Sequence, residues 1–205
     1  MAIVIAVGLF ANFARSESVN FDNTKTGGLP KGWQAGITGP GTPKWSVETD
    51  ASAPSQPNAL KQAGVVPSHS YPWCVKKHVP LANGSIQVSF KTISGKEDQA
   101  AGLIWRWQNG DNYYIARANA LENNIILFRT VNGTRHQLHE VPMKVTSNQW
   151  HTLRVDFQSN HFAVAFDGQK ALEWDDDTFK QAGLVGLWTK ADSVVLFDNF
   201  TFEGK

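Results

Sequence analysis

The stretch HTLRVDFQSNHFAVAFDG, residues 151–168, alternates apolar and polar side chains in both of its halves. The apolar positions are Leu153, Val155 and Phe157 in the first half and Phe162, Val164 and Phe166 in the second. A period of two places these side chains on one face of an extended strand and the polar residues on the other. Asp167-Gly168 then supplies a dipeptide that is typical of a tight turn between strands. The stretch therefore predicts antiparallel β-strands with one face buried in a core.

The same pattern extends outward along the chain. Residues 84–91, GSIQVSFK, alternate in the same way, and turn dipeptides occur at 83–84, 109–110 and 132–133. Strand-sized segments follow one another about every 8–12 residues, which is typical of a sandwich. No long segment has helical periodicity, and a short helical turn is expected only over 175–183. We therefore predict an all-β fold, a two-sheet antiparallel β-sandwich of the jelly-roll type.

The segment 27–67 is rich in glycine and proline and differs from the rest of the chain. Within it we expect shorter strands joined by loops, near Trp33–Thr38, Trp45–Thr49 and Ala59–Gln62. No linker and no internal repeat divides the sequence. A chain of 205 residues that is 41% hydrophobic can bury one sizeable core. The sequence therefore predicts a single jelly-roll domain over residues 17–205.

The first 16 residues differ from this domain. An apolar run extends from Ala2 to Ala11, and small residues flank Arg15 just before the end of the segment. This arrangement resembles a leader cleaved after Ser16, so we predict a signal peptide over residues 1–16 and a secreted or periplasmic protein. The apolar run is shorter than the roughly 20 residues that a membrane-spanning helix needs, so no membrane span is predicted. The alternative is a first β-strand of the domain.

Composition excludes some partners and favours others. Lys and Arg total 19 against 18 for Asp and Glu, and a net charge of +1 gives no electrostatic basis for binding nucleic acid. Cys74 is the only cysteine, so no internal disulfide can form, and we expect a small buried side chain there. The 8 Trp and 12 Phe residues provide aromatic surface suited to the flat apolar faces of sugars.

Segments of the C-terminal two-thirds carry a combined pattern. They are AAGLIWRW (100–107), DNYYIARANALENN (111–124), QWHTLRVDF (149–157), FAVAFDGQ (162–169) and AGLVGLWTKADSVVLFDNFTF (182–202). A strand with W-H-x-L-x-V, a hairpin with D-G and then G-x-V-G-L-W-T is typical of the concanavalin A-like jelly rolls. The chain resembles that group of laminin-G-like lectin and glucanase domains. The opening FDNTKTGGLPKGW (21–33) resembles their bacterial secreted branch, which includes 3-keto-disaccharide hydrolase domains.

This resemblance is consistent with three functions, because one fold hosts unrelated activities. We favour a secreted, non-catalytic domain that binds a saccharide on its concave face. The alternatives are a glycoside hydrolase or lyase of the 3-keto-disaccharide type and a laminin-G-like protein-interaction module. Glucanases of this fold carry E-x-D-x-x-E, whose carboxylates supply acid and nucleophile, and this chain lacks the motif. The acidic run at 173–177 has a different spacing, so Glu122 and Asp111 remain as candidate catalytic acids or bases.

Strand alternation selects four candidates for sugar binding. In AGLIWRWQ (101–108), Leu103, Trp105 and Trp107 share one face, which is expected in the core, and Ile104, Arg106 and Gln108 share the other. This leaves Arg106 on the open concave side. In DNYYIARAN (111–119) the face opposite Tyr114 is expected to be open as well. The candidates are Arg106, Tyr113, Arg117 and Asn119, with Arg117 beside Arg106. The alternative is that each arginine pairs with an aspartate and that ANALENN only forms a turn.

The segment WTKADS completes the candidate site. Val185 and Leu187 fit the core, so Trp188 is expected on the opposite, concave face. We predict that Trp188 is a platform for a sugar ring, with Lys190 and Asp192 at its rim. The alternative is that Trp188 packs beneath a loop and that the polar residues after it only turn the chain.

The resemblance also implies one ion. Many jelly rolls of this group hold a structural Ca²⁺ between the first and last strands, with carboxylate and carbonyl ligands. Asp22 and Asp198, each within an F-D-N sequence, resemble that arrangement. The alternative is that both are ordinary aspartates at strand ends.

Overall fold

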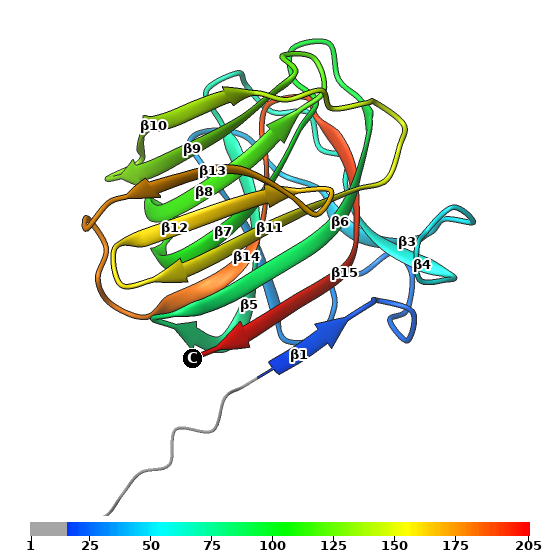
Figure 1. The fold of residues 1–205 in the computed structure, drawn as a ribbon. Helices are drawn as coiled ribbons and strands as arrows, with labels where there is room; N and C mark the ends of the chain where they lie inside the picture. The colour runs from blue at the N-terminus through cyan, green and yellow to red at the C-terminus, as the bar shows by residue number, and fades with distance from the viewer. Residues whose placement is uncertain (1–15) are drawn as a thin grey trace, which may run out of the picture.

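The computed structural model of the protein describes residues 16–205. This part of the chain forms 15 β-strands in two antiparallel sheets that face each other, with no helix among them (Figure 1). The predicted all-β, two-sheet antiparallel sandwich is confirmed. No helix within residues 16–205 provides a segment that could cross a bilayer. The predicted leader lies outside the described residues except for Ser16, the first residue of β1.

Each sheet has a defined strand order. The eight-stranded sheet contains, in spatial order, β13 (Gln169–Asp175), β12 (His161–Phe166), β11 (His151–Gln158), β6 (Gly84–Ser94), β15 (Val194–Gly204), β4 (Asn58–Gln62) and β3 (Trp45–Thr49), and β1 (Ser16–Val19) pairs with β15. The seven-stranded sheet contains β10 (Thr134–Pro142), β9 (Asn124–Val131), β8 (Asn112–Asn119), β7 (Ala100–Asn109), β14 (Gly183–Thr189), β5 (Tyr71–Leu81) and β2 (Trp33–Thr38). Neighbouring strands in these orders are therefore often distant in sequence.

The hairpin predicted from residues 151–168 is formed by β11 and β12. Leu153 lies across from Phe166, and Phe157 lies across from Phe162. The short strands expected in the glycine-rich and proline-rich segment are also confirmed, as β2, β3 and β4.

The helical turn expected over residues 175–183 is wrong. The chain forms an irregular loop after β13, and the carboxylate of Asp176 organises it. Asp176 Oδ1 accepts hydrogen bonds from the Tyr114 hydroxyl at 2.5 Å and from the Thr178 backbone N–H at 2.9 Å. These bonds supply the local partners that a helical turn would otherwise provide.

Apolar side chains cover both faces of the seven-stranded sheet. Along β14, Val185 and Leu187 point into the core between the sheets, whereas Leu184 and Trp188 point away from it. The apolar side chains on the face that points away from the core form a second cluster, which we call the outer cluster. Its buried members are Tyr71, Trp73, Val75, Ala100, Ile104, Tyr113, Ile115, Ile126, Phe128 and Trp188, and Trp107 and Leu184 pack against them. The face expected to be open is therefore largely filled by aromatic side chains.

The alternation along β7 breaks at Arg106. This residue has a φ of 48°, and the pairing of β7 with β8 shifts between Trp105 and Asn109. A bulge of this kind reverses the faces of the residues that follow it. Trp105 therefore lies in the core between the sheets, but Trp107 packs against Trp73 in the outer cluster. The prediction that Trp107 lies in the main core is wrong.

The first and last described strands lie side by side. In the register of β1 and β15, Ser16 is across from Glu203 and Val19 is across from Phe200. Figure 1 shows β1 beside β15, near the C-terminus of the chain. The two ends of the domain therefore meet on the eight-stranded sheet, while the outer cluster belongs to the other sheet.

Candidate functional site

The outer cluster is centred on Trp188. Its indole is fully buried and stacks on Tyr71, with ring centroids 5.6 Å apart and planes inclined by 20°. Trp188 thus points to the predicted face. The expectation that its ring is an open platform is wrong, because other side chains cover it. One of these is Arg135, which no sequence argument singled out.

Arg135 lies over three rings of the outer cluster. Its guanidinium carbon is 4.2 Å from the ring centroid of Phe128, 4.7 Å from that of Tyr71 and 5.7 Å from that of Trp188. No hydrogen bond or ion pair joins the side chain of Arg135 to another residue in the part of the chain that the structure describes, and its Nη1 atom is sealed from solvent. Burial lowers the pKa of its guanidinium below the usual value. Only ring faces therefore hold this cation in place.

The position of Arg135 could have been found from strand pairing. The tight turn at residues 132–133 places Arg135 across from Thr130, and Thr130 in turn lies across from Tyr113. Directly paired residues share a face of the sheet, so all three side chains lie on the same side. The row of polar residues that begins at Tyr113 thus continues to the edge strand β10.

Arg117 is nearly buried at the edge of the outer cluster. Its Nη2 atom pairs with Glu122 Oε2 at 2.5 Å, and its Nη1 atom donates to Asn124 Oδ1 at 2.7 Å. Its Nε atom is buried without a partner. Burial alone would raise the pKa of Glu122, but hydrogen bonding to Arg117 holds that pKa below its usual value. Glu122 is therefore an ionised partner of Arg117, a poor state for a general acid at neutral pH.

Asn119 and Lys190 meet at a buried carboxylate, Asp98, that sequence reasoning missed. Asn119 Nδ2 donates to Asp98 Oδ1 at 2.7 Å, and Lys190 Nζ pairs with Asp98 Oδ2 at 2.5 Å. Asn119 Oδ1 also accepts a hydrogen bond from the backbone N–H of Leu121 at 2.9 Å. This bond agrees with the alternative that the segment forms a turn. Asn119 is therefore fully buried and has a structural role, whereas the side chain of Lys190 is partly exposed.

Asp192 holds a loop. Its carboxylate accepts backbone N–H groups from Lys96 at 2.7 Å, from Glu97 at 3.1 Å and from Asp98 at 3.0 Å. Burial would raise the pKa of Asp192, and these three bonds hold it below the usual value. The carboxylate predicted at the rim of the sugar site thus positions Asp98, which then pairs with Lys190.

Tyr113 is closed off by the end of β2. It is fully buried, and its hydroxyl shares a hydrogen bond of 2.6 Å with the hydroxyl of Thr38. Burial raises the pKa of Tyr113 to about 12. Thr38 also donates to the carbonyl oxygen of Gly110, so the end of β2 is bonded to β8 and to the turn before it. The prediction that Tyr113 lines an open face is therefore wrong.

Arg106 points to the opposite side of the sheet from Tyr113. It is 1% exposed, and it lies near Phe162 of the main core. The residue paired with Arg117 on β7 is Gly102, so Arg106 and Arg117 are not neighbours. The predictions that Arg106 faces the concave side and lies beside Arg117 are both wrong, because the bulge redirects its side chain.

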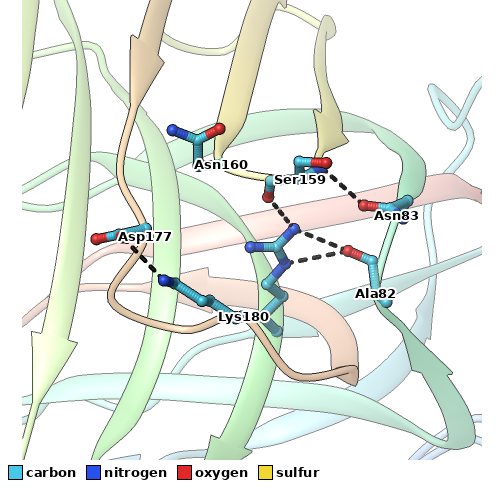
Figure 2. Close-up of a pocket in the computed structure, with 7 residues that line it drawn as sticks. Ala82, Asn83, Ser159, Asn160, Asp177 and Lys180 are labelled. Carbon is cyan, nitrogen blue, oxygen red and sulfur yellow. Dashed lines mark hydrogen bonds and ion pairs between the residues drawn. The ribbon is translucent and has the colours of Figure 1, made fainter.

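The donors of Arg106 bind backbone carbonyls of three loops. Nε and Nη2 donate to Ala82 O at 3.1 and 2.9 Å, Nη2 also donates to Ser159 O, and Nη1 donates to Phe179 O at 2.7 Å. The guanidinium thus lies between Ala82 and Ser159, which Figure 2 shows among the residues that line a hollow. The arginine thus ties together three connections at one end of the sandwich.

This hollow has a volume of about 410 Å³. Its lining residues are Ala82, Asn83, Arg106, Ser159, Asn160, Asp177 and Lys180. Lys180 pairs with Asp177 at 3.0 Å across it (Figure 2). None of the lining residues is aromatic, so the hollow lacks a flat apolar surface for a sugar ring.

The two candidate catalytic carboxylates lie at opposite ends of β8. Asp111 is exposed in the turn before this strand, and Glu122 follows the other end. A strand of this length separates them by roughly 25 Å. Glycosidases place their two carboxyl groups about 5–9.5 Å apart. Asp111 and Glu122 therefore cannot act as an acid–base pair on one bond.

Asp22 and Asp198 come together as the resemblance implies. Ser55 bridges them, since its hydroxyl donates to Asp22 and its backbone N–H donates to Asp198 Oδ2 at 2.7 Å. Burial and then the negative charge of Asp22 raise the pKa of Asp198 to about 6. Within residues 16–205 no three His, Cys, Asp or Glu side chains are grouped to hold a metal. The pair provides part of the oxygen ligand set that Ca²⁺ takes, so calcium binding stays a prediction.

Residues 75–191 match the family described as the beta xylosidase C-terminal concanavalin A-like domain. The chain belongs to this family. The match includes β7, β8, β9, β10 and β14, which carry most of the outer cluster. The predicted resemblance to concanavalin A-like jelly rolls is thereby confirmed. A comparison with the curated proteins gives no match.

Solved structures share the fold of this beta xylosidase C-terminal concanavalin A-like domain. A carbohydrate binding module, CBM66 from Bacillus subtilis, superposes with a TM-score of 0.68 at 16% identity, covering 84% of this chain and 96% of its own. A Bacillus licheniformis beta-glucanase gives 0.61 at 13% identity, with 93% and 98% covered. A GH16 protein from the Bacteroides ovatus mixed linkage glucan PUL gives 0.59 at 11%, with 92% and 99% covered. At such identities the likeness shows the fold alone.

Proposed function

We propose that this domain binds a saccharide on the outer face of its seven-stranded sheet without catalysing a reaction. The site consists of the cationic patch and the aromatic rings beneath it. The cationic patch is defined by Arg117, Arg135 and Lys190 together with the carboxylates of Asp98 and Glu122. The predicted residues Trp188, Arg117, Asn119 and Lys190 all contribute to this region, although most are more deeply buried than expected.

One observation carries this proposal. Within residues 16–205, Arg117 Nε and Arg135 Nη1 are buried on the outer face without a hydrogen-bond partner. Buried polar groups without partners are rare and point to a missing ligand or water. Here they gather beside aromatic rings. Sugars present apolar C–H faces and many hydroxyl groups, so they match both components of this surface.

Access to the rings depends on Arg135. This residue lies on the edge strand β10 and is half-buried, and only aromatic faces hold its guanidinium. Such contacts contribute about 0.5–2 kcal/mol. A sugar ring can therefore take the place of the guanidinium over Tyr71 while Arg135 rotates outward to bind the hydroxyl groups of the sugar.

The relatives support this function. The family is named for a domain of a beta xylosidase, and the Bacillus subtilis structure is described as a carbohydrate binding module. The wide separation of Asp111 and Glu122 supports binding without catalysis. The apolar run at residues 2–11 supports a secreted or periplasmic location.

Isothermal titration calorimetry against a panel of neutral and acidic oligosaccharides tests the proposal. We expect at least one saccharide to bind the wild-type domain and to bind Arg135→Ala at least about tenfold more weakly, a loss of roughly 1.4 kcal/mol. Arg154→Ala is the matched control, because Arg154 is an exposed arginine on β11 of the other sheet. Absence of binding across the panel, or equal losses in both variants, would overturn the proposal.

A further inference from the structure

Arg135 is the unbalanced charge of the cationic patch. Glu122 is 2.5 Å from Arg117 and Asp98 is 2.5 Å from Lys190, so each carboxylate already has its own cation. In the part of the chain that the structure describes, no carboxylate lies within ion-pair distance of Arg135. Glu140, on the same strand, is bound by the side-chain amides of Asn124 and Gln137.

Within the described residues, the side-chain N–H groups of Arg135 also lack hydrogen-bond acceptors, in addition to its charge lacking a carboxylate partner. A guanidinium offers five N–H groups in a planar fork. None of those on Arg135 reaches an acceptor in residues 16–205, and one nitrogen is shielded from water. A partly desolvated cation without acceptors is unfavourable, so a group that supplies both oxygen atoms and negative charge stabilises it most.

We propose that the saccharide bound at this site carries a uronic acid carboxylate that pairs with Arg135, an inference that rests on the proposed function. The two carboxylate oxygens match two parallel N–H groups of the fork, which a single sugar hydroxyl does not. The sugar ring that bears this carboxylate lies against Tyr71 and Trp188. Arg117 Nε binds one of its hydroxyl groups, since this buried atom lacks another partner among the described residues.

Matched pairs of ligands test this assignment. Oligomers of galacturonic acid, glucuronic acid and mannuronic acid are each titrated beside their methyl esters, which keep the sugar but remove the charge. Sulfated neutral oligomers form a third arm. We expect at least one acid to bind about tenfold more tightly than its ester at low salt. The preference should shrink as salt is added, because the attraction is electrostatic.

Variants at position 135 identify the residue responsible. Arg135→Gln should abolish the preference for the acid over its ester, and Arg135→Lys should restore part of it because the charge returns without the fork. Arg154→Gln, on the other sheet, should leave the preference intact. Thermal melts of all three confirm that each variant is folded.

The outcomes separate this inference from the proposed function. If neutral sugars and esters bind as tightly as acids, or if the preference persists in Arg135→Gln, the acidic ligand is wrong while saccharide binding stands. A preference for sulfated oligomers over uronic acids also overturns the inference that the ligand carries a carboxylate. If no saccharide of any kind binds, the proposed function fails and the inference fails with it.

Discussion

Gly36 lies across from Trp73 in the pairing of β2 with β5, and a Cβ atom at Gly36 would lie 2.4 Å from the Trp73 ring. The indole occupies the space that any larger residue at position 36 would need. Trp73 in turn lies across from Trp188, and Trp188 lies across from Gly102. Two glycines therefore flank two tryptophans on the outer face, so the large rings fit beside each other on a crowded sheet.

Gly36→Ala should destabilise the domain for this reason. Forcing an extra methyl group into a packed site typically costs about 1–3 kcal/mol. We expect a decrease of that size in the free energy of unfolding, measured by urea titration. Gly28→Ala is the control, because the nearest atom to a Cβ there is 4.0 Å away. Equal stability of the two variants would contradict the packing found around Trp73.

Arg106→Met should destabilise the domain without removing the saccharide site. The substitution leaves the carbonyls of Ala82, Ser159 and Phe179 without their donor. A hydrogen bond to a charged group contributes about 1.5–3 kcal/mol, and water can bind the carbonyls of the exposed residues Ala82 and Ser159, so we expect a total loss of about 2 kcal/mol or more. Urea titration measures this loss, and Arg154→Met should cost about 1 kcal/mol or less. Loss of saccharide affinity in folded Arg106→Met protein would contradict a purely structural role.

Asp198 should make stability depend on pH. Its pKa is about 6 in the folded protein and 3.8 for the free side chain, so the folded state holds the proton more tightly. The stability that protonation provides is complete below about pH 3.8 and is lost as pH rises through about 6. We expect the Tm of the wild type, relative to that of Asp198→Asn, to decrease over this interval. Parallel curves for the two proteins would contradict the environment described for Asp198.

Calcium provides a second test of the same pair. If the ion bridges Asp22 and Asp198, as the sequence predicts, millimolar CaCl₂ should raise the Tm by a few degrees at pH 7.5, and EDTA should reverse the rise. The effect should be absent in Asp22→Asn. MgCl₂ is the control, because Mg²⁺ demands tighter octahedral geometry. An unchanged Tm in CaCl₂ would contradict calcium binding. Protonation of Asp198 would then be what reduces the repulsion between the two carboxylates.

The domain should not turn over 3-keto-disaccharides. Asp111 and Glu122 are too far apart to act together, and Glu122 is paired with Arg117. We expect no reducing sugar to be released above the rate in buffer, as measured by chromatography of the products. Release that is abolished by Glu122→Gln and retained by Glu140→Gln would establish an enzyme and refute this expectation.

The sequence predicted most of the fold because alternation is local. Residues 151–168 contain both strands of their hairpin, and the bounds of β2 and β3 follow from short apolar segments between Gly and Pro. The direction of Trp188 followed from Val185 and Leu187 in the same way. Each of these inferences depends only on neighbours along the chain.

The site was harder to predict because it depends on contacts between distant segments. The positive φ of Arg106 reverses the faces after it, and a period of two cannot show where such a bulge lies. The burial of Tyr113 depends on Thr38, and the covering of Trp188 depends on Arg135. Strand order, which the sequence pattern does not contain, brings these residues together.

The pairing of Ser16 with Glu203 makes the domain suited to modular rearrangement. Its two described ends are separated by about one strand spacing, roughly 4.8 Å. A host protein could therefore accept the whole domain within one of its surface loops, and a short peptide could join the ends to give a circular permutant. A fusion made at this edge attaches to the eight-stranded sheet, so Arg135 on the other sheet stays accessible to a polysaccharide chain.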